Sequence, residues 1–346
     1  MGAVRTLVNR TQSRSAVRAL MLWLIAVNLA AWLGAALAFH AHPALMGTAL
    51  LAWILGLRHA LDADHLAAID NVVRKQVQRG EQPLATGLYF SLGHSTIVVA
   101  ATAALALATR ALPQHWQALQ STGQVLGTTI SSLFLFLLAA INVGTLYNLA
   151  QQMRRLHAQD GAASTGQEIP GFEAPGGLLA RIFSPVLRLT QKSWHMYGVG
   201  FLFGLGFDTA SEVALLALSA TQIAHGIGFA QVMMLPALFT AGMMLLDTAD
   251  SIFMAGAYGW AMLHPARKLG YNFTITAASV LMAAFIGSVE IAGLLGARLH
   301  MNSGLWGGIA ALNNNLTLFG ICALGVFAFC WIAASVLFRR YRSPAI

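Results

Sequence analysis

The chain is built largely from long apolar stretches separated by short polar segments. Eight of them reach the length of about 20 residues that a helix needs to cross the hydrocarbon core of a bilayer. They run approximately over residues 20–39, 44–72, 87–109, 126–149, 195–220, 229–260, 273–296 and 306–338. Because helices satisfy all their backbone hydrogen bonds internally, this pattern predicts an all-α, polytopic membrane protein with eight transmembrane helices.

The composition argues against a water-soluble protein. Only 9% of the 346 residues are charged and 57% are hydrophobic, whereas soluble domains carry about 25% charged residues. A net charge of +8 would suit a nucleic-acid-binding protein, but the basic residues stand in short clusters between the apolar stretches. We therefore expect the lipid bilayer, and not nucleic acid, to be the partner of this surface. Cys322 and Cys330 lie about 12 Å apart along one predicted helix, too far for a disulfide.

The basic clusters also predict how the chain is oriented. Lys and Arg gather before the first stretch, after the second, fourth and sixth, and in the tail. The alternate loops hold only Arg110 and Arg298. Since cytoplasmic loops carry the excess of basic residues, both termini are predicted to be cytoplasmic. The expected organisation is a cytoplasmic N-terminal segment 1–19, helices one to four over 20–149, a cytoplasmic loop 150–194, helices five to eight over 195–338 and a cytoplasmic tail 339–346.

Acidic residues inside the predicted spans indicate a polar interior. Each would cost about 2.5–3.5 kcal/mol at the centre of a bilayer. They must therefore face the interior of the bundle or a water-filled cavity. The residues concerned are Asp62, Asp64, Asp70, Asp208, Glu212, Asp247, Asp250 and Glu290.

The densest cluster is the string RHALDADH in the second stretch. At 100° per residue, a regular helix places His59, Asp62 and His65 on one face, while Asp64 points to another side. Arg58 precedes Asp62 by four residues and can pair with it. Imidazole nitrogen and carboxylate oxygen on one face are the donors that a divalent transition metal uses.

Three further stretches contribute polar groups at a similar depth. His94 lies in the third, Asp208 and Glu212 in the fifth, and Asp247 and Asp250 in the sixth. Counting 1.5 Å per residue from the cytoplasmic ends places these groups in one slab of the membrane. The predicted metal ligands are His59, Asp62, Asp64, His65 and His94. The predicted gating or supporting residues are Arg58, Asp70, Asp208, Glu212, Asp247 and Asp250.

The string RHALDADH contains the pattern His-x4-Asp-His and resembles the signature of the nickel/cobalt transporter (NiCoT) family of high-affinity nickel permeases. Three other stretches resemble further motifs of that family, at residues 90–96, 205–212 and 242–250. Two small departures are Ser211, where the family often has Thr, and Ser251, where it often has Gly.

The resemblance implies selective uptake of Ni²⁺, often with Co²⁺, through the bacterial cytoplasmic (inner) membrane. It also implies that His59, Asp64 and His65 are central to metal recognition. On this interpretation the divalent ion is the substrate, no cofactor is bound permanently, and the protein is not an enzyme.

Two alternatives remain open from the sequence. The first is nickel or cobalt efflux on the same scaffold, but exporters of this wider group tend to carry a histidine-rich cytoplasmic segment and the central loop here has only His157. The second is an intramembrane metalloenzyme, which would want a motif such as H-E-x-x-H that this sequence lacks. The sequence also lacks a G-x-x-x-x-G-K-[ST] nucleotide-binding motif. We therefore expect a secondary permease that requires no ATPase partner.

Two polar features are not assigned to the metal site. For Glu290, the sequence does not distinguish a structural acid from a functional one. The asparagines at 313–315 are interpreted as hydrogen-bonding groups between helices.

The charge pattern generates a test of the orientation. Single cysteines introduced at positions between 155 and 190, after removal of Cys322 and Cys330, should resist membrane-impermeant thiol reagents in intact cells, because this loop is predicted to be cytoplasmic. The measurement is the extent of labelling before and after permeabilisation. Ready labelling in intact cells would reverse the orientation.

Overall fold

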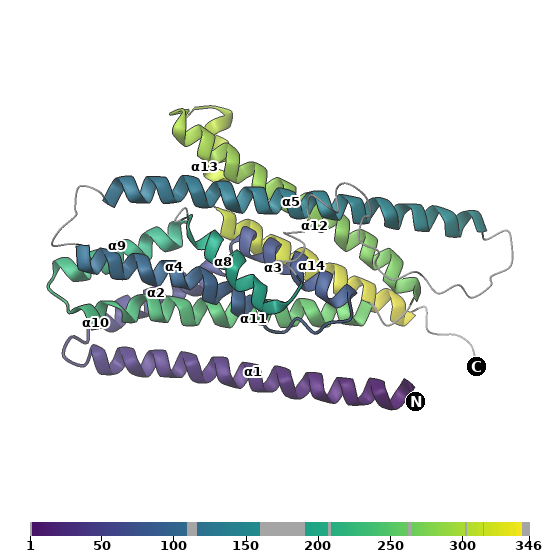
Figure 1. Cartoon of the computed structure of the whole chain (residues 1–346), viewed down its shortest axis with the longest axis horizontal. Helices are drawn as coiled ribbons and strands as arrows, with labels where there is room; N and C mark the ends of the chain where they lie inside the picture. Colours follow the sequence, from purple (N-terminus) through teal and green to yellow (C-terminus); the bar gives the residue numbers. More distant parts are fainter. Residues whose placement is uncertain are drawn as a thin grey trace.

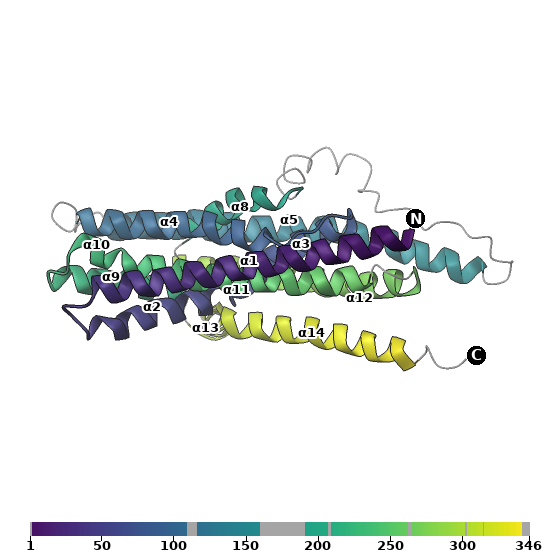
Figure 2. The same cartoon turned by 90° about the horizontal axis from the view of Figure 1, so that it is seen from below.

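The computed structural model describes residues 2–108, 116–159, 191–206, 209–261, 265–301, 303–313 and 315–340, and it is all-helical over these ranges. The long helices run side by side along one axis (Figures 1 and 2). α1 begins and α14 ends at the same end of this bundle (Figures 1 and 2).

The helices pack in an order that puts α11 at the centre. In chain order they are α1 (Gly2–Ala38), α2 (Leu45–His59), α3 (Ala63–Gln78), α4 (Thr86–Ala108), α5 (Trp116–Gln159), the 3-10 turn η1 (Ser193–His195), α8 (Met196–Gly204), α9 (Ala210–Ala224), α10 (Phe229–Val232), α11 (Met234–Ala261), α12 (Pro265–Arg298), α13 (Leu305–Asn313) and α14 (Leu316–Arg340). α11 contacts α1, α2, α3 and α4, whereas α12 lies along α5.

The prediction of an all-α membrane protein is confirmed, although its spans are not all continuous. Within the described residues, five helical segments are long and apolar enough to cross a membrane, or six if one bent pair counts as a single span. The five are Arg14–Ala38, Thr86–Leu107, Gln124–Gln151, Phe229–Gly259 and Phe273–Arg298. They correspond to the first, third, fourth, sixth and seventh predicted stretches. The other three stretches are interrupted, so the prediction of a continuous helix is wrong for each of them.

The second stretch, predicted over 44–72, divides into α2 and α3. The chain leaves helical geometry at Asp62, whose φ of −66° and ψ of 142° are extended, and α3 then begins at Ala63. Asp is favoured at such an N-terminal position, and Asp64 in the first turn complements the helix dipole. The face assigned from a continuous helix therefore does not apply across this break.

The fifth and eighth stretches are interrupted in related ways. After α8, the chain passes through Gly206 and becomes helical again at α9, where the Oγ1 of Thr209 accepts from the backbone N–H of Glu212 at 3.4 Å. Asp208, predicted as a supporting residue, lies outside the described residues. In the eighth stretch α13 and the following Leu316–Val326 meet at 67°, and α13 projects from the bundle (Figure 1).

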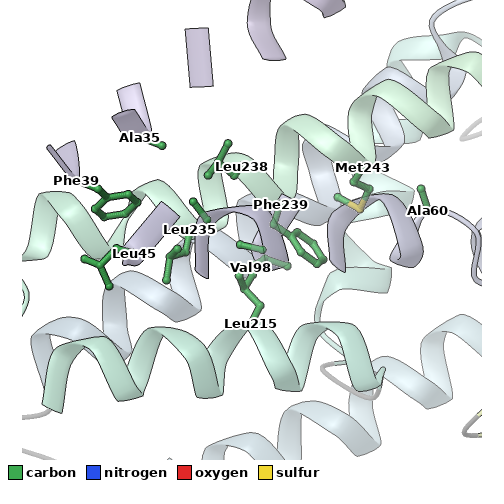
Figure 3. Close-up of a cluster of buried hydrophobic side chains, with 12 residues drawn as sticks. Ala35, Phe39, Leu45, Ala60, Val98, Leu215, Leu235, Leu238, Phe239 and Met243 are labelled. Carbon is green, nitrogen blue, oxygen red and sulfur yellow. The ribbon is translucent and has the colours of Figure 1, made fainter. Parts of the chain in front are cut away.

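An apolar cluster packs one half of the bundle around α11 (Figure 3). Phe39 just after α1, Leu45 from α2, Val98 from α4 and Leu215 from α9 meet Phe239 from α11. The ring of Phe239 lies 5.5 Å from the ring of His59, centroid to centroid. The apolar cluster therefore packs directly against His59.

Gly56 permits the close contact between α2 and α11. A Cβ placed on Gly56 would overlap the backbone carbonyl of Phe239, so the two helices approach with no side chain between them. Gly47 lies on the same helix, and a Cβ there would meet nothing within 4 Å.

These two glycines give a matched test of the packing. Gly56→Ala should lower the free energy of unfolding of the detergent-solubilised protein by about 1–3 kcal/mol, because the added methyl group forces α11 away from α2. Gly47→Ala should leave it unchanged or raise it by up to about 1 kcal/mol, because Ala favours helix over Gly. Thermal unfolding followed by intrinsic fluorescence measures both. Equal stability of the two variants would contradict the assigned contact.

Candidate metal centre

Three buried imidazoles meet at the break between α2 and α3. His59 ends α2, His65 lies in the first turn of α3, and His94 lies within α4. Their exposed fractions are 0%, 0% and 2%. One ring nitrogen from each lies within 4.8 Å of the others, so the cluster has the dimensions of a metal site.

The spacing of the ring nitrogens suits a shared cation. The Nε2 atoms of His59 and His94 are 2.9 Å apart. Two nitrogens bound at right angles to one ion, each at about 2.1 Å, would be about 3 Å apart. The Nε2 of His65 is buried and has no hydrogen-bond partner among the described residues. An ion at this point would receive the lone pairs that the fold brings together.

Two of the three imidazoles are oriented by an acidic side chain at Nδ1. The Nδ1 of His59 lies 3.0 Å from Asp62 Oδ2, and the Nδ1 of His65 lies 3.4 Å from Asp247 Oδ2. An ionised carboxylate can only accept, so Nδ1 carries the hydrogen and Nε2 presents its lone pair. Carboxylates behind ligating histidines have this same effect in metal sites generally.

Glu212 occupies a different position from the other two acids. Its Oε1 lies 2.9 Å from the Nε2 of His94, the same nitrogen that faces His59. One hydrogen on that nitrogen can serve only one of these two neighbours at a time. A cation between them would contact all three groups, so Glu212 stands within reach of a bound ion. Thr209 holds this acid by donating to its Oε2 at 3.1 Å.

The break at 60–62 explains how residues six apart in sequence share one centre. Asp62 immediately precedes the new helix, and its side chain does not cap that helix. Oδ2 contacts His59, while Oδ1 accepts from Thr317 of α14. The expected ion pair between Arg58 and Asp62 is not formed, because the extended backbone at Asp62 turns its carboxylate toward His59 and α14. Asp62 therefore contacts the Nδ1 of His59, on the side of the ring away from the Nε2 that faces His94, and is not one of the groups that meet in the cluster.

The remaining predicted residues are distributed around this centre. Asp64 is buried beside the cluster, and its Oδ1 has no hydrogen-bond partner among the described residues. Asp70 lies further along α3, where Tyr258 and Ser279 donate to it. Asp250 is also buried, and neither of its carboxylate oxygens has a partner in the described part of the chain. The structure thus brings His59, His65 and His94 together and leaves Asp70 and Asp250 outside their immediate contacts.

Three hydroxyl groups at the centre were not predicted as site residues. Ser91 donates to Asp247 Oδ2 at 2.6 Å, Thr209 contacts His59 Nδ1 at 3.3 Å, and Thr317 donates to Asp62. Ser91 and Thr209 stand inside the motif stretches, three residues before His94 and Glu212 respectively. That spacing is a signal from which both could be proposed as site residues. Thr317 has no such signal, because only the bend between α13 and α14 brings it to the site.

Buried imidazoles with carboxylates behind two of them, in a bundle whose helices are apolar enough to cross a membrane, are the arrangement expected of a membrane protein that handles a transition-metal ion. The model of the NicO family, described as high-affinity nickel-transport protein, matches residues 45–337. The chain belongs to this family. This is a family of transport proteins and not of enzymes, which confirms the resemblance to nickel/cobalt permeases and the prediction that the chain is not an enzyme.

Curated relatives match along most of their length. The chain is 48% identical over 332 residues to the hydrogenase nickel incorporation protein HupN of Bradyrhizobium diazoefficiens, covering 96% of this chain and 86% of that one. It is 47% identical over 319 residues to a high-affinity nickel transport protein of Cupriavidus necator, covering 92% and 90%. It is 37% identical over 349 residues to the cobalt transport protein NhlF of Rhodococcus rhodochrous, covering 99% and 96%. No solved structure matches the chain.

The carboxylate behind His65 gives a prediction specific to this geometry. Asp247→Asn keeps the shape of the side chain but removes the charge that orients the ring, so Ni²⁺ affinity of the purified protein should fall about 10–100-fold. Isothermal titration calorimetry in detergent measures it. Glu81→Gln, an exposed acid outside the site, is the control and should bind as the unmodified protein does. Unchanged affinity in Asp247→Asn would remove this residue from the site.

Proposed function

We propose that the chain is a permease that imports Ni²⁺, with Co²⁺ as a second substrate, across the bacterial cytoplasmic membrane. The observation that carries this proposal is the buried cluster of His59, His65 and His94, in which one ring nitrogen of each lies within 4.8 Å of the others. Names of relatives that transport nickel, and of one that transports cobalt, support both substrates.

The donor set suits these ions. Imidazole nitrogen favours first-row transition metals such as nickel, whereas oxygen-only sites favour magnesium and calcium. Cu²⁺ binds such ligands more tightly than Ni²⁺ or Co²⁺, so selection has to come from geometry. His59, His65 and His94 are the proposed ligands, with Glu212 within reach, while Asp62 and Asp247 orient the rings. Asp64, predicted as a ligand, lies beside them with an available oxygen.

For the topology we propose eight crossings, three of them by broken helices, with both termini in the cytoplasm. Non-helical backbone is tolerated at membrane depth where protein or a cavity surrounds it, and broken helices commonly form the ion sites of transporters. The common end of the bundle reached by the start of α1 and the end of α14 supports this arrangement (Figure 2). Segments 1–19, 150–194 and 339–346 are then cytoplasmic.

The driving force in this proposal is the membrane potential. An inner-negative potential of about 100 mV contributes about 4.6 kcal/mol to the entry of a dication, which sustains a gradient of about 2,000-fold. Neither an ATPase partner nor a resident cofactor is needed for this transport.

Transport by the purified protein in liposomes tests the proposal. Ni²⁺ should accumulate without ATP when the interior is negative, and accumulation should be abolished in His59→Ala and His65→Ala, because the dehydrated ion loses a ligand. The measurement is Ni²⁺ content normalised to inserted protein, with His225→Ala, an exposed histidine at the end of α9, as control.

The other outcomes of this assay are informative. Strict dependence on ATP would refute the secondary permease. Normal transport by both helix-break variants would refute the imidazole site. In cells, net loss of preloaded Ni²⁺ through the chain under an inner-negative potential would favour the efflux alternative.

A further inference from the structure

All three broken helices contribute to one pocket. The space in it that the centre of a water molecule can reach is about 20 Å³, and it lies where the breaks converge. The end of α2 and the start of α3 form one wall, the start of α9 another, and α12 with the α13–α14 bend the rest. Its polar lining consists of Arg58, Asp62, Asp64, Thr209, Glu290, Asn313 and Thr317.

The pocket adjoins the imidazole cluster directly. Asp62 and Thr209 line the pocket and also contact the Nδ1 of His59, at 3.0 Å and 3.3 Å. The two sites therefore share a wall, and an ion leaving the pocket past these side chains would meet His59 first.

The formal charge of the lining is negative. Asp62, Asp64 and Glu290 supply three acids against the single base Arg58, which gives a net charge of −2. Asp64 is 8% exposed, and its buried Oδ1 has no hydrogen-bond partner among the described residues. A buried carboxylate oxygen without a donor is costly unless a cation or water reaches it. This unpaired oxygen therefore indicates that the pocket binds a cation or a water molecule.

Glu290 is fixed on the opposite wall by α5. Ser132 and Ser131 donate to its Oε2 at 2.8 and 3.1 Å. Gly293, one turn further along α12, leaves room for Asn313, whose Cγ would lie 3.1 Å from a Cβ on that glycine. A carboxylate and an amide from different helices are thus held in the same pocket as Asp64.

The donors of this pocket differ in kind from those of the cluster. Carboxylate, amide and hydroxyl oxygens bind divalent cations while leaving part of their water in place, whereas imidazoles suit the partly dehydrated transition metal. In the proposed topology, Glu290 lies eight residues before Arg298, which ends α12 on the outer side. That places it about 12 Å from this end of the helix. Counted in the same way, His59 lies about 21 Å from the outer start of α2, so Glu290 forms the outer wall of the pocket, whereas Asp62 and Asp64 follow His59 and form its inner wall.

We infer that this pocket is a receiving site, in which oxygen donors that include Glu290 and Asn313 bind the divalent cation, already stripped of most of its water, before it passes to His59, His65 and His94. This inference rests on the proposed import of Ni²⁺. It adds Glu290, which lies outside the four motif stretches, to the residues that contact the ion.

The substitution Glu290→Gln tests the inference, because the amide still accepts from Ser132 but lacks the charge. In liposomes, KM for Ni²⁺ uptake should rise about tenfold and its dependence on ionic strength should weaken, since the local field that concentrates the cation is reduced. The maximal rate and the equilibrium affinity of the imidazole cluster, measured by calorimetry, should each change less than twofold. Glu290→Asp should recover part of the loss, and Glu81→Gln should behave as the unmodified protein.

The outcomes separate this inference from the proposed function. If the unmodified protein transports Ni²⁺ and Glu290→Gln has the same KM and salt response, the receiving site is wrong and the permease stands. If the unmodified protein does not transport Ni²⁺, the proposed function itself fails. Loss of calorimetric affinity in Glu290→Gln equal to the change in KM would overturn the inference, because the residue would then act on the imidazole cluster.

A second variant tests the pocket if Glu290→Gln does not insert. Asn313→Cys, in a chain lacking the two native cysteines, should react with a methanethiosulfonate reagent in detergent, and Cd²⁺ alone should slow that reaction at least fivefold. Reaction at the same rate with and without Cd²⁺ would show that no divalent cation occupies the pocket and would overturn the inference.

Discussion

The structure depends on orienting three imidazoles inside a bundle that faces lipid. A neutral ring can point either nitrogen toward an ion, and only a fixed partner on the other side determines which one does so. Asp62 and Asp247 fill this role for His59 and His65, and hydroxyl groups in turn hold the two acids. These acids and hydroxyl groups come from the link before α3 and from α4, α11 and α14. Much of the bundle therefore contributes a side chain that fixes this one centre.

Breaks in helices make such a centre possible. A continuous helix offers one face and satisfies its own backbone, whereas a break lets side chains from both halves approach the same point. The glycine contact between α2 and α11 and the apolar cluster around Phe239 hold the halves in place. Stability of the apolar packing and placement of the polar groups are therefore linked through α11.

Much of the centre could be predicted from sequence for a simple reason. Charged and imidazole groups in apolar stretches are costly, so His59, His65 and His94 had to face inward and could be found by their residue type alone. The breaks could not be found in this way, because α2 and α3 together read as one apolar run and hydropathy does not register an extended residue such as Asp62. The pairing of Arg58 with Asp62 was wrong because it assumed a regular helix.

Five residues separate His59 from His65, and the first three of them, 60–62, form a link that lies outside both helices. Rotation about a few backbone bonds there would swing α3 relative to α2 while leaving the internal hydrogen bonds of both helices intact. The distance between the two imidazoles therefore depends on the backbone torsions of this link and on the packing of α3, whose residues 63–76 are buried. The geometry of the centre is therefore a property of how two helices are oriented, which a substitution in the link would change without altering any of the imidazoles.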